Sequence, residues 1–248
     1  MTVVTADFDE DGWIDIFVAC DSTPSLLFMN NRDGTFREEG VTRGVALSDD
    51  GMEQAGMGVG VGDYDLDGHL DLFKTHFADD ANGLYHNDGK ANFDELTHSS
   101  LLAVETRYVC WGAGMIDLDN DGYPDIALAA LQNETFPIYQ NVSGTSFQEI
   151  TARSKMTVLS NPMSGYSVNI DDFDNDGWKD IFVSRGDVAS PNMADRLHVD
   201  QPNTVFRNLN GTWSVLTEEA GFAAPLRVRL GWIAAIAFAS GFPFGLIN

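Results

Sequence analysis

Basic residues are scarce in this chain, which has 14 lysines and arginines against 38 aspartates and glutamates in 248 residues. The formal charge of −24 excludes nucleic acid as a partner, because phosphate binding needs a basic surface. The sequence also lacks G-x-S-x-G, H-E-x-x-H and P-loop motifs, and its five histidines show no metal-ligand spacing. No catalytic residue is therefore assigned, and we expect a protein that is not an enzyme.

Cysteine is almost absent too. Cys20 and Cys110 fall on predicted strands that would not be neighbours in a ring, so two buried free thiols are expected rather than a disulfide. Cysteine usage therefore does not decide the compartment. No signal peptide is visible at the N-terminal end of the sequence.

What the chain does contain is a nine-residue aspartate pattern, present four times. It reads DFDEDGWID from Asp7, DYDLDGHLD from Asp63, DLDNDGYPD from Asp117 and DFDNDGWKD from Asp172, with starts 56, 54 and 55 residues apart. Near-constant spacing of this kind is typical of a repeat architecture. The pattern predicts the chemistry of each repeat and the spacing predicts its size.

Each copy, called an aspartate loop below, places carboxylates at positions 1, 3, 5 and 9 and a glycine at position 6. Alternate residues on a tightly curled loop point at one centre, and the glycine permits the sharp turn. Clustered oxygen donors suit Ca²⁺, with Mg²⁺ as second choice, and about four calcium sites are expected. The predicted ligands are Asp7, Asp9, Asp11, Asp15, Asp63, Asp65, Asp67, Asp71, Asp117, Asp119, Asp121, Asp125, Asp172, Asp174, Asp176 and Asp180.

The loop is not an EF-hand, which needs a glutamate at position 12 and flanking helices. Position 12 is Val18, Lys74, Leu128 or Val183, and the residues after each glycine alternate or run apolar as in a strand. A hairpin follows, with an asparagine, a glycine turn and a closing aromatic residue, as in LLFMNNRDGTF. Each repeat therefore predicts four short antiparallel strands.

Stacking such sheets around an axis buries their faces, so an all-β β-propeller with blades of about 55 residues is favoured over a linear array or a sandwich. Four copies predict a partial ring of four blades. The expected units are about 1–55, 56–109, 110–164 and 165–222. Long segments between units, at 41–55, 97–107 and 151–164, are where ligand contacts are expected.

The strings GDYDLDGHLDLF, DLDNDGYPDIAL and DDFDNDGWKDIFV resemble the FG-GAP/VCBS repeat family, in particular the group of cartilage acidic proteins and bacterial proteins with an ASPIC/UnbV domain. The resemblance covers residues 1–222. The resemblance implies a seven-bladed propeller whose calcium ions are bound by the sixteen aspartates named above. It also implies an extracellular, periplasmic or cell-surface location. The chain departs from the family pattern in having few repeats and no C-terminal ASPIC/UnbV segment.

The expected function is a non-enzymatic calcium-binding module for extracellular or cell-surface binding and adhesion, with a protein or carbohydrate ligand. The alternative is a polysaccharide lyase or hydrolase on the same scaffold. Residues 223–248 form a hydrophobic tail, uncharged from Leu230 to Ile247 and close to the length of a membrane span. This uncharged stretch resembles the first transmembrane helix of major-facilitator transporters, so membrane contact, a fused segment and a buried apolar strand all stay open.

Overall fold

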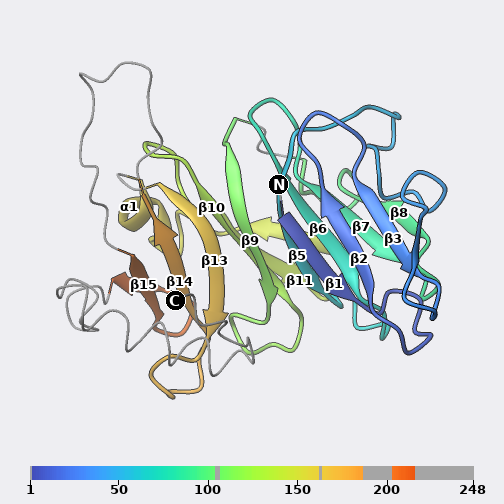
Figure 1. Ribbon diagram of the computed structural model, residues 1–248. Coiled ribbons are helices and arrows are strands. Elements are labelled where there is room, and N and C mark those ends of the chain that lie inside the picture. The colour runs from blue at the N-terminus through green and yellow to red at the C-terminus, as the bar shows by residue number, and fades with distance from the viewer. Residues whose placement is uncertain (1, 104–106, 162–163, 187–202, 216–248) are drawn as a thin grey trace, which may run out of the picture.

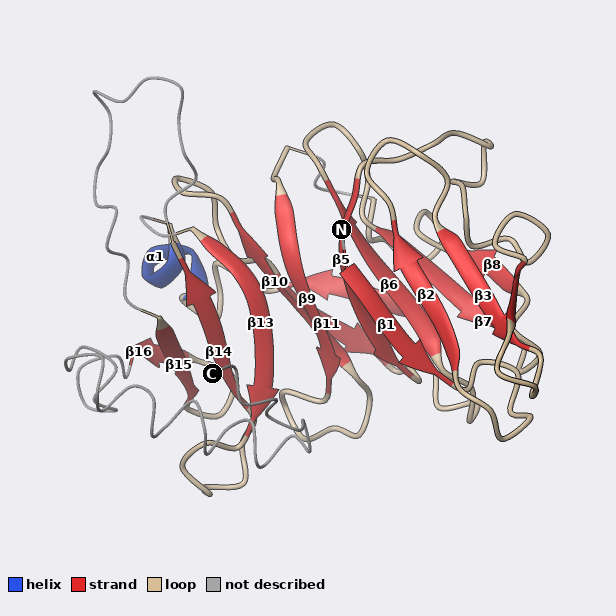
Figure 2. Ribbon diagram, viewed as in Figure 1, coloured by secondary structure: helices blue, strands red, loops and turns tan. Residues whose placement is uncertain are grey.

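The computed structural model describes residues 2–103, 107–161, 164–186 and 203–215, which form sixteen strands and one short helix (Figure 2). Blade 1 contains β1 (Thr2–Ala6), β2 (Asp15–Ala19), β3 (Leu26–Asn30) and β4 (Phe36–Glu38). Blade 2 contains β5 (Gly56–Gly62), β6 (Asp71–His76), β7 (Gly83–Asn87) and β8 (Phe93–Glu95). Blade 3 contains β9 (Cys110–Ile116), β10 (Asp125–Ala130), β11 (Ile138–Val142) and β12 (Ser146–Glu149). Blade 4 contains β13 (Gly165–Asp171), β14 (Asp180–Arg185), β15 (Thr204–Asn208) and β16 (Trp213–Val215).

Every blade is a four-stranded antiparallel meander whose strands follow one another in chain order. In each blade the aspartate loop joins the first and second strands, and its ninth residue is the first residue of the second strand. The polar hairpin joins the third and fourth strands, which begin to pair at Asn30↔Phe36, Asn87↔Phe93 and Asn208↔Trp213. The four-stranded repeat predicted from the sequence is therefore confirmed.

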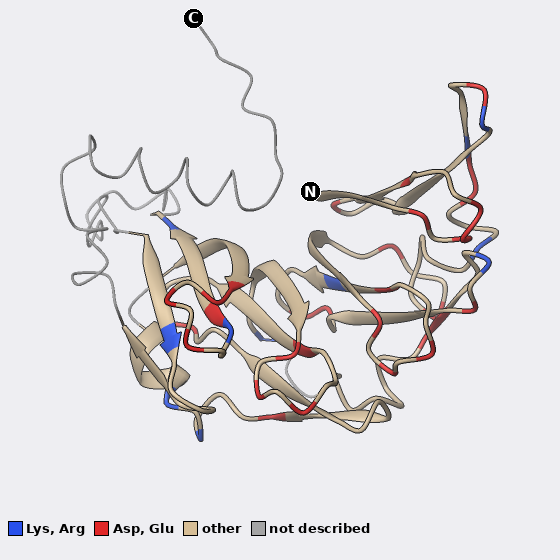
Figure 3. Ribbon diagram, turned by 90° about the horizontal axis from the view of Figure 1, so that it is seen from below, with Lys and Arg blue, Asp and Glu red and all other residues tan. Residues whose placement is uncertain are grey.

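The blades stack through their first strands, with β1 against β5, β5 against β9 and β9 against β13 (Figure 1). Seen from below, the four sheets follow an arc, and acidic residues are frequent in its loops (Figure 3). Between the blades lie two apolar clusters, one around Phe17 and Tyr85 and the other around Ile126 and Tyr139. The fold is thus an all-β partial ring of propeller blades, as the sequence predicts.

The first strands approach so closely that side chains are excluded from parts of them. A Cβ added at Gly58 would lie 1.8 Å from the Trp111 carbonyl oxygen of the next blade. The Thr75 hydroxyl bridges the same contact, because it accepts from the Gly58 N–H at 2.7 Å and donates to the Trp111 carbonyl at 2.9 Å. The backbones of blades 2 and 3 therefore approach closely at this point, and the Thr75 hydroxyl links them.

Gly58→Ala is expected to lower the free energy of unfolding by about 2 to 4 kcal/mol, because backbone must move to admit the methyl group. Gly60→Ala on the same strand is the matched control, since its Cβ would meet Met115 at an ordinary 3.5 Å. Urea unfolding of the two variants measures the difference. Equal stability of both would show that the close approach is not a constraint.

One element was not predicted from the sequence. The segment between blades 3 and 4 contains α1 (Met156–Ser160), which buries Met156 and Ser160. The Ser160 hydroxyl accepts from the Phe136 N–H at 2.9 Å and so fixes α1 to the loop after β10. Cys20 and Cys110 are both buried and form no disulfide, as predicted.

The hydrophobic tail, residues 223–248, lies outside the described residues, so the predictions for it stay open. Within the described ranges, no helix is both long enough and apolar enough to cross a membrane.

Candidate metal centres in the aspartate loops

The four aspartate loops share one backbone conformation. Gly12, Gly68, Gly122 and Gly177, at position 6, have φ angles of 87°, 97°, 96° and 91°, in the left-handed region that glycine tolerates. The carboxylate at position 1 accepts the N–H of that glycine at 2.8 to 2.9 Å in all four loops. The carboxylate at position 5 accepts the N–H of position 7 at 2.9 to 3.0 Å. These bonds curl each loop around its own side chains.

The ninth aspartate fixes the loop to the rest of its blade. Asp125, for example, is 2 % exposed and accepts the Leu118 N–H at 2.9 Å with one oxygen and the Asn141 N–H at 2.7 Å with the other. The same two bonds recur at the other three ninth positions, Asp15, Asp71 and Asp180. This carboxylate therefore holds the aspartate loop against the third strand.

The hairpin asparagine, noted in the sequence without a role, joins neighbouring blades. The Asn141 side-chain amide donates to the Pro124 carbonyl of its own blade at 2.9 Å and to the Tyr64 carbonyl of blade 2 at 2.8 Å. Asn87 donates likewise to Phe8 of blade 1, and Asn208 to Leu118 of blade 3. The acceptor is always the second residue of the preceding aspartate loop. In the sequence, the asparagine recurs just before a glycine turn in each repeat, and this recurrence was the signal for its role.

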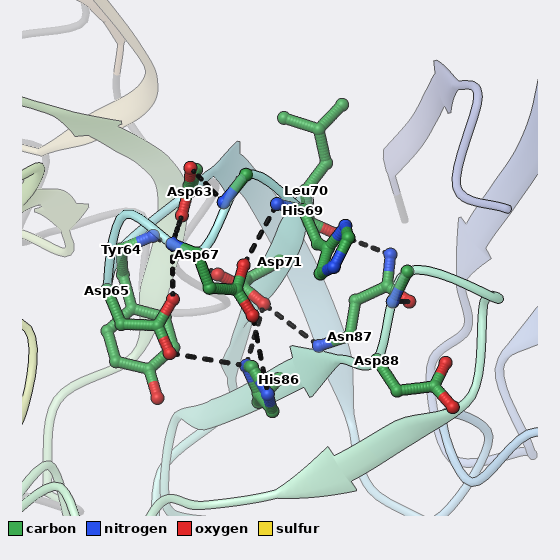
Figure 4. A network of polar contacts seen from close by, with 12 residues as sticks. Asp63, Tyr64, Asp65, Asp67, His69, Leu70, Asp71, His86, Asn87 and Asp88 are labelled. Atoms are coloured by element: carbon green, nitrogen blue, oxygen red, sulfur yellow. Dashed lines mark hydrogen bonds and ion pairs between the residues drawn. The ribbon is translucent and has the colours of Figure 1, made fainter. Parts of the chain in front are cut away.

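The predicted ligands converge, although not all four in any one loop. One carboxylate oxygen from each of positions 1, 3 and 9 lies within 4.8 Å of the others in loops one, three and four. In loop two the grouped residues are Asp63, Asp65 and Asp67, and a second group joins Asp65 and Asp71 to His86 (Figure 4). In loops one, three and four the position-5 aspartates Asp11, Asp121 and Asp176 lie outside these groups.

Side chains from the third strand, or from the turn that follows it, also reach the loops, and the sequence did not predict them. Arg32 contacts Asp11 at 2.6 Å, and Arg207 contacts Asp174 at 2.5 Å and Asp176 at 3.1 Å. His86 lies 3.3 Å from Asp71 and 3.6 Å from Asp65. Among the described residues, loop three has only the uncharged Gln140, which donates to Asp119. Loop three is thus the loop with the least offset of its negative charge.

The carboxylates of each loop lie close together although their negative charges repel one another, and their pKa values reflect this. Burial raises the pKa of all four ninth-position carboxyls, that of Asp125 to about 7. Burial, followed by the charge of the neighbouring aspartate at position 5, raises the pKa of Asp9 and Asp65. In contrast, the hydrogen bond from Arg32 holds the pKa of Asp11 below its usual range. Positive charge at the loop centres would favour the ionised carboxylates.

The donor set fits a hard divalent cation. Buried polar atoms normally have a partner, yet one carboxylate oxygen of Asp9 and one of Asp117 are buried without a hydrogen-bond donor among the described residues. Both residues belong to the converging groups. Several carboxylate oxygens around a glycine turn are the ligands that Ca²⁺ prefers. A cation at each loop centre would coordinate these oxygens and would also offset the repulsion between the carboxylates.

Sequence comparison agrees with this architecture. The FG-GAP-like repeat family matches residues 7–74 and 117–183, each of which begins at the first aspartate of a loop. The match covers more than half of the chain. This chain belongs to the FG-GAP-like repeat family.

Its curated relatives include Cartilage acidic protein 1 of Homo sapiens, 27 % identical over 204 residues, and of Xenopus tropicalis, 26 % identical over 210 residues. These alignments cover 78 % and 79 % of this chain but 29 % of each relative, so the chain spans less than a third of their length.

Two solved structures share part of the arrangement, and each alignment covers 85 % of this chain and 49 % of the other. One is an Agrocybe aegerita lectin described as recognising non-reducing terminal N-acetylglucosamine, with 19 % identity and a TM-score of 0.48. The other is a Bacillus licheniformis rhamnogalacturonan lyase, with 14 % identity and a TM-score of 0.44.

Proposed function

We propose that the chain is a calcium-stabilised propeller segment that works outside the cytoplasm as a non-enzymatic binding module. The observation that carries the proposal is the set of converging carboxylates, two with buried oxygens that lack a donor. The proposed ligands are the sixteen aspartates of the four loops. Calcium is the ion that suits such oxygens, and extracellular modules use it at millimolar concentrations. The name of the curated relatives, which places them in cartilage, supports an extracellular location.

Calcium's role in this proposal is structural. Each aspartate loop joins the first two strands of its blade, and the carbonyl of its second residue accepts the asparagine of the next blade in three of the four loops. Neighbouring loops also touch directly, since the Asn120 amide donates to the Gly177 carbonyl at 3.1 Å. A cation that fixes one loop therefore fixes both a blade and its junction with the next.

Asp117→Asn is expected to remove about one of four calcium equivalents in a calorimetric titration. The amide keeps the shape of the carboxylate and one oxygen for the Gly122 N–H, but it removes the charge at the buried oxygen. Asp94→Asn is the control, because Asp94 is an exposed aspartate on β8 outside the loops. Four equivalents in the Asp117 variant would refute the ligand assignment.

For the binding role, we infer that a carbohydrate ligand meets the segment between blades 3 and 4. A hollow of about 410 Å³ opens there, within the usual range for ligand sites. Its lining includes Tyr108, Asn133, Glu134, Glu149 and Asn161, and it contains no lysine or arginine. Amides, carboxylates and phenol groups suit sugar hydroxyls, whereas the two glutamates disfavour anionic sugars.

A screen of the chain on an array of neutral and acidic glycans tests this inference. Binding to neutral glycans is expected, with Asn133→Ala weakening it about tenfold or more through the lost hydrogen bonds. Calcium uptake should be unchanged in that variant, and Asp94→Asn should bind as the unmodified chain does. Binding that survives Asn133→Ala together with Glu149→Gln would move the ligand site elsewhere.

A further inference from the structure

Aspartate loop two differs from the other three in the third-strand side chain that directly precedes the hairpin asparagine. That side chain is Met29, His86, Gln140 or Arg207 in blades 1 to 4. Of these four side chains, only the imidazole of His86 has a ring nitrogen whose lone pair can bind a divalent metal ion. Loop two therefore has a possible nitrogen ligand at a position where the other three blades have none.

The sheet of blade 2 fixes His86 beside the loop. Strands β6 and β7 pair with Leu72 opposite Tyr85. The same register, continued by one residue, places Asp71 at the start of β6 beside His86 near the end of β7. The Tyr64 ring also meets the His86 ring edge to face, with centroids 6.2 Å apart. Strand register and ring contact together hold the imidazole against the carboxylates (Figure 4).

Both ring nitrogens of His86 face carboxylates. Nδ1 lies 3.3 Å from Asp71 Oδ1 and 3.6 Å from Asp65 Oδ2, and Nε2 lies 3.8 Å from an oxygen of Asp67. These separations exceed the roughly 2.7 to 3.2 Å of an N–H···O hydrogen bond. Zinc holds nitrogen and oxygen ligands at about 2.0 to 2.1 Å, so two ligands of a tetrahedral ion lie about 3.3 to 3.4 Å apart. The spacing of Nδ1 from Asp65 and Asp71 is therefore close to that of ligands around one small ion.

The Nδ1 atom of His86 is buried and has no hydrogen-bond partner among the described residues. Buried polar atoms normally have one. Asp71, which is 0 % exposed, accepts the Tyr64 N–H with one oxygen and the Asn87 N–H with the other. A carboxylate oxygen has two lone pairs, so each Asp71 oxygen keeps one. The nitrogen and the buried carboxylate can therefore both bind an ion without losing a bond to the protein.

From these contacts we propose that aspartate loop two binds Zn²⁺ in preference to Ca²⁺, through Asp65, Asp71 and His86 Nδ1. The proposal rests on the proposed function in one respect, that this loop binds a divalent cation. Imidazole suits zinc, whereas calcium prefers oxygen ligands throughout. The two carboxylates balance the charge of the ion. Asp67 lies on the side where a carboxylate commonly accepts the other N–H of a metal-bound histidine. Without zinc, the oxygen-only group of Asp63, Asp65 and Asp67 leaves the loop open to calcium.

Calorimetric titration of the full chain with Zn²⁺ at saturating Ca²⁺ tests the proposal, and about one tight equivalent is expected. His86→Gln gives loop two the side chain that loop three has at this position. It should weaken that equivalent by about a hundredfold or more, since loss of even an outer partner of a metal ligand costs about 10- to 100-fold. His98→Gln, at an exposed histidine after β8, is the control and should bind zinc as the unmodified chain does. Equal zinc affinity with and without His86 would mean adventitious binding elsewhere and would overturn the proposal.

NMR of protein labelled in the histidine ring nitrogens reports on the ligand atom itself. Zinc should leave the His86 ring with the metal on Nδ1 and the proton on Nε2, and these signals should be absent from the His86→Gln variant. A histidine that only offsets negative charge as a protonated cation would take up no zinc. A His86 spectrum that does not change with zinc would therefore overturn the proposal.

Calcium titration of the same proteins without zinc separates this proposal from the proposed function. His86→Gln removes no carboxylate, so about four calcium equivalents are expected with and without the substitution. Calcium uptake without a tight zinc equivalent would overturn the zinc site alone. Uptake of neither ion would overturn both the zinc site and the calcium-stabilised propeller.

Discussion

Chelation of calcium with EDTA is expected to lower the melting temperature of this chain by about 20 °C or more, because each kcal/mol shifts it by roughly 2 to 4 °C. A site with free calcium at about a hundred times its Kd stabilises the fold by about 2.7 kcal/mol. Four such sites sum to roughly 11 kcal/mol, which is comparable with the whole stability of a typical domain. The cause is electrostatic, since buried carboxylates converge in each loop without sufficient positive charge.

The measurement is thermal unfolding followed by circular dichroism, with calcium, with EDTA, and with EDTA followed by excess calcium. The last sample should recover the first melting curve. Magnesium in place of calcium should restore less, because it requires a smaller and more regular ligand shell. Melting curves that superimpose with and without EDTA would contradict the structural role of calcium.

Asn141→Ala is expected to lower the free energy of unfolding by about 3 to 5 kcal/mol, because a buried group left without a partner costs about 1 to 3 kcal/mol. Asn141 is 2 % exposed. Its amide serves the Tyr64 and Pro124 carbonyls, and its oxygen accepts the Gly144 N–H at 2.8 Å. The variant would open the junction between blades 2 and 3 as well as the hairpin turn.

The matched control is Asn30→Ala, measured by the same urea titration in dilute protein. Asn30 has the same place in blade 1, but its side-chain bonds to Ile14 and Arg32 are exposed and water replaces them. A loss of about 1 kcal/mol is expected there. Equal losses in the two variants would show that the asparagine stabilises only its own hairpin.

The fold was predictable because the same sequence pattern occurs four times in the chain. The spacing of the aspartate loops gave the size of a blade, and alternation after each Asp-Gly gave the second strand. The hairpin before Phe36, Phe93 and Trp213 gave the third and fourth strands. The exception is α1, a five-residue helix in a segment that occurs once. Because this segment has no second copy in the sequence, repetition could not distinguish a helix from a turn there.

The candidate site was predictable only in part, for a geometric reason. Alternation on a curled loop places carboxylates near a common centre, but it does not show which of them are also used by the backbone. The ninth aspartate bonds to two N–H groups and holds the third strand, while outside loop two the fifth aspartate does not join the converging group and bonds to the loop's own N–H or to an arginine. The contacts from Arg32, His86 and Arg207 come from the third strand or the turn after it and depend on register, which the aspartate pattern does not encode.

The charges of these added side chains make the electrostatic environments of the four loops unequal. Arg207 contacts two carboxylates of loop four, whereas among the described residues no cationic side chain forms an ion pair with loop three, and Arg153 reaches it only through Gln140. Since a nearby cation disfavours a second one, loop three should bind calcium most tightly and loop four least. The two loops have the same four aspartates and the same glycine, so the aspartate pattern alone does not show this difference.

A crystal structure grown with calcium tests the central claim most directly, using anomalous scattering to identify the ion. Four anomalous peaks are predicted, each among the carboxylates of one aspartate loop, with the one beside Asp117 and Asp125 the strongest. Loops without anomalous density, with water or an arginine side chain between the carboxylates at saturating calcium, would contradict the account.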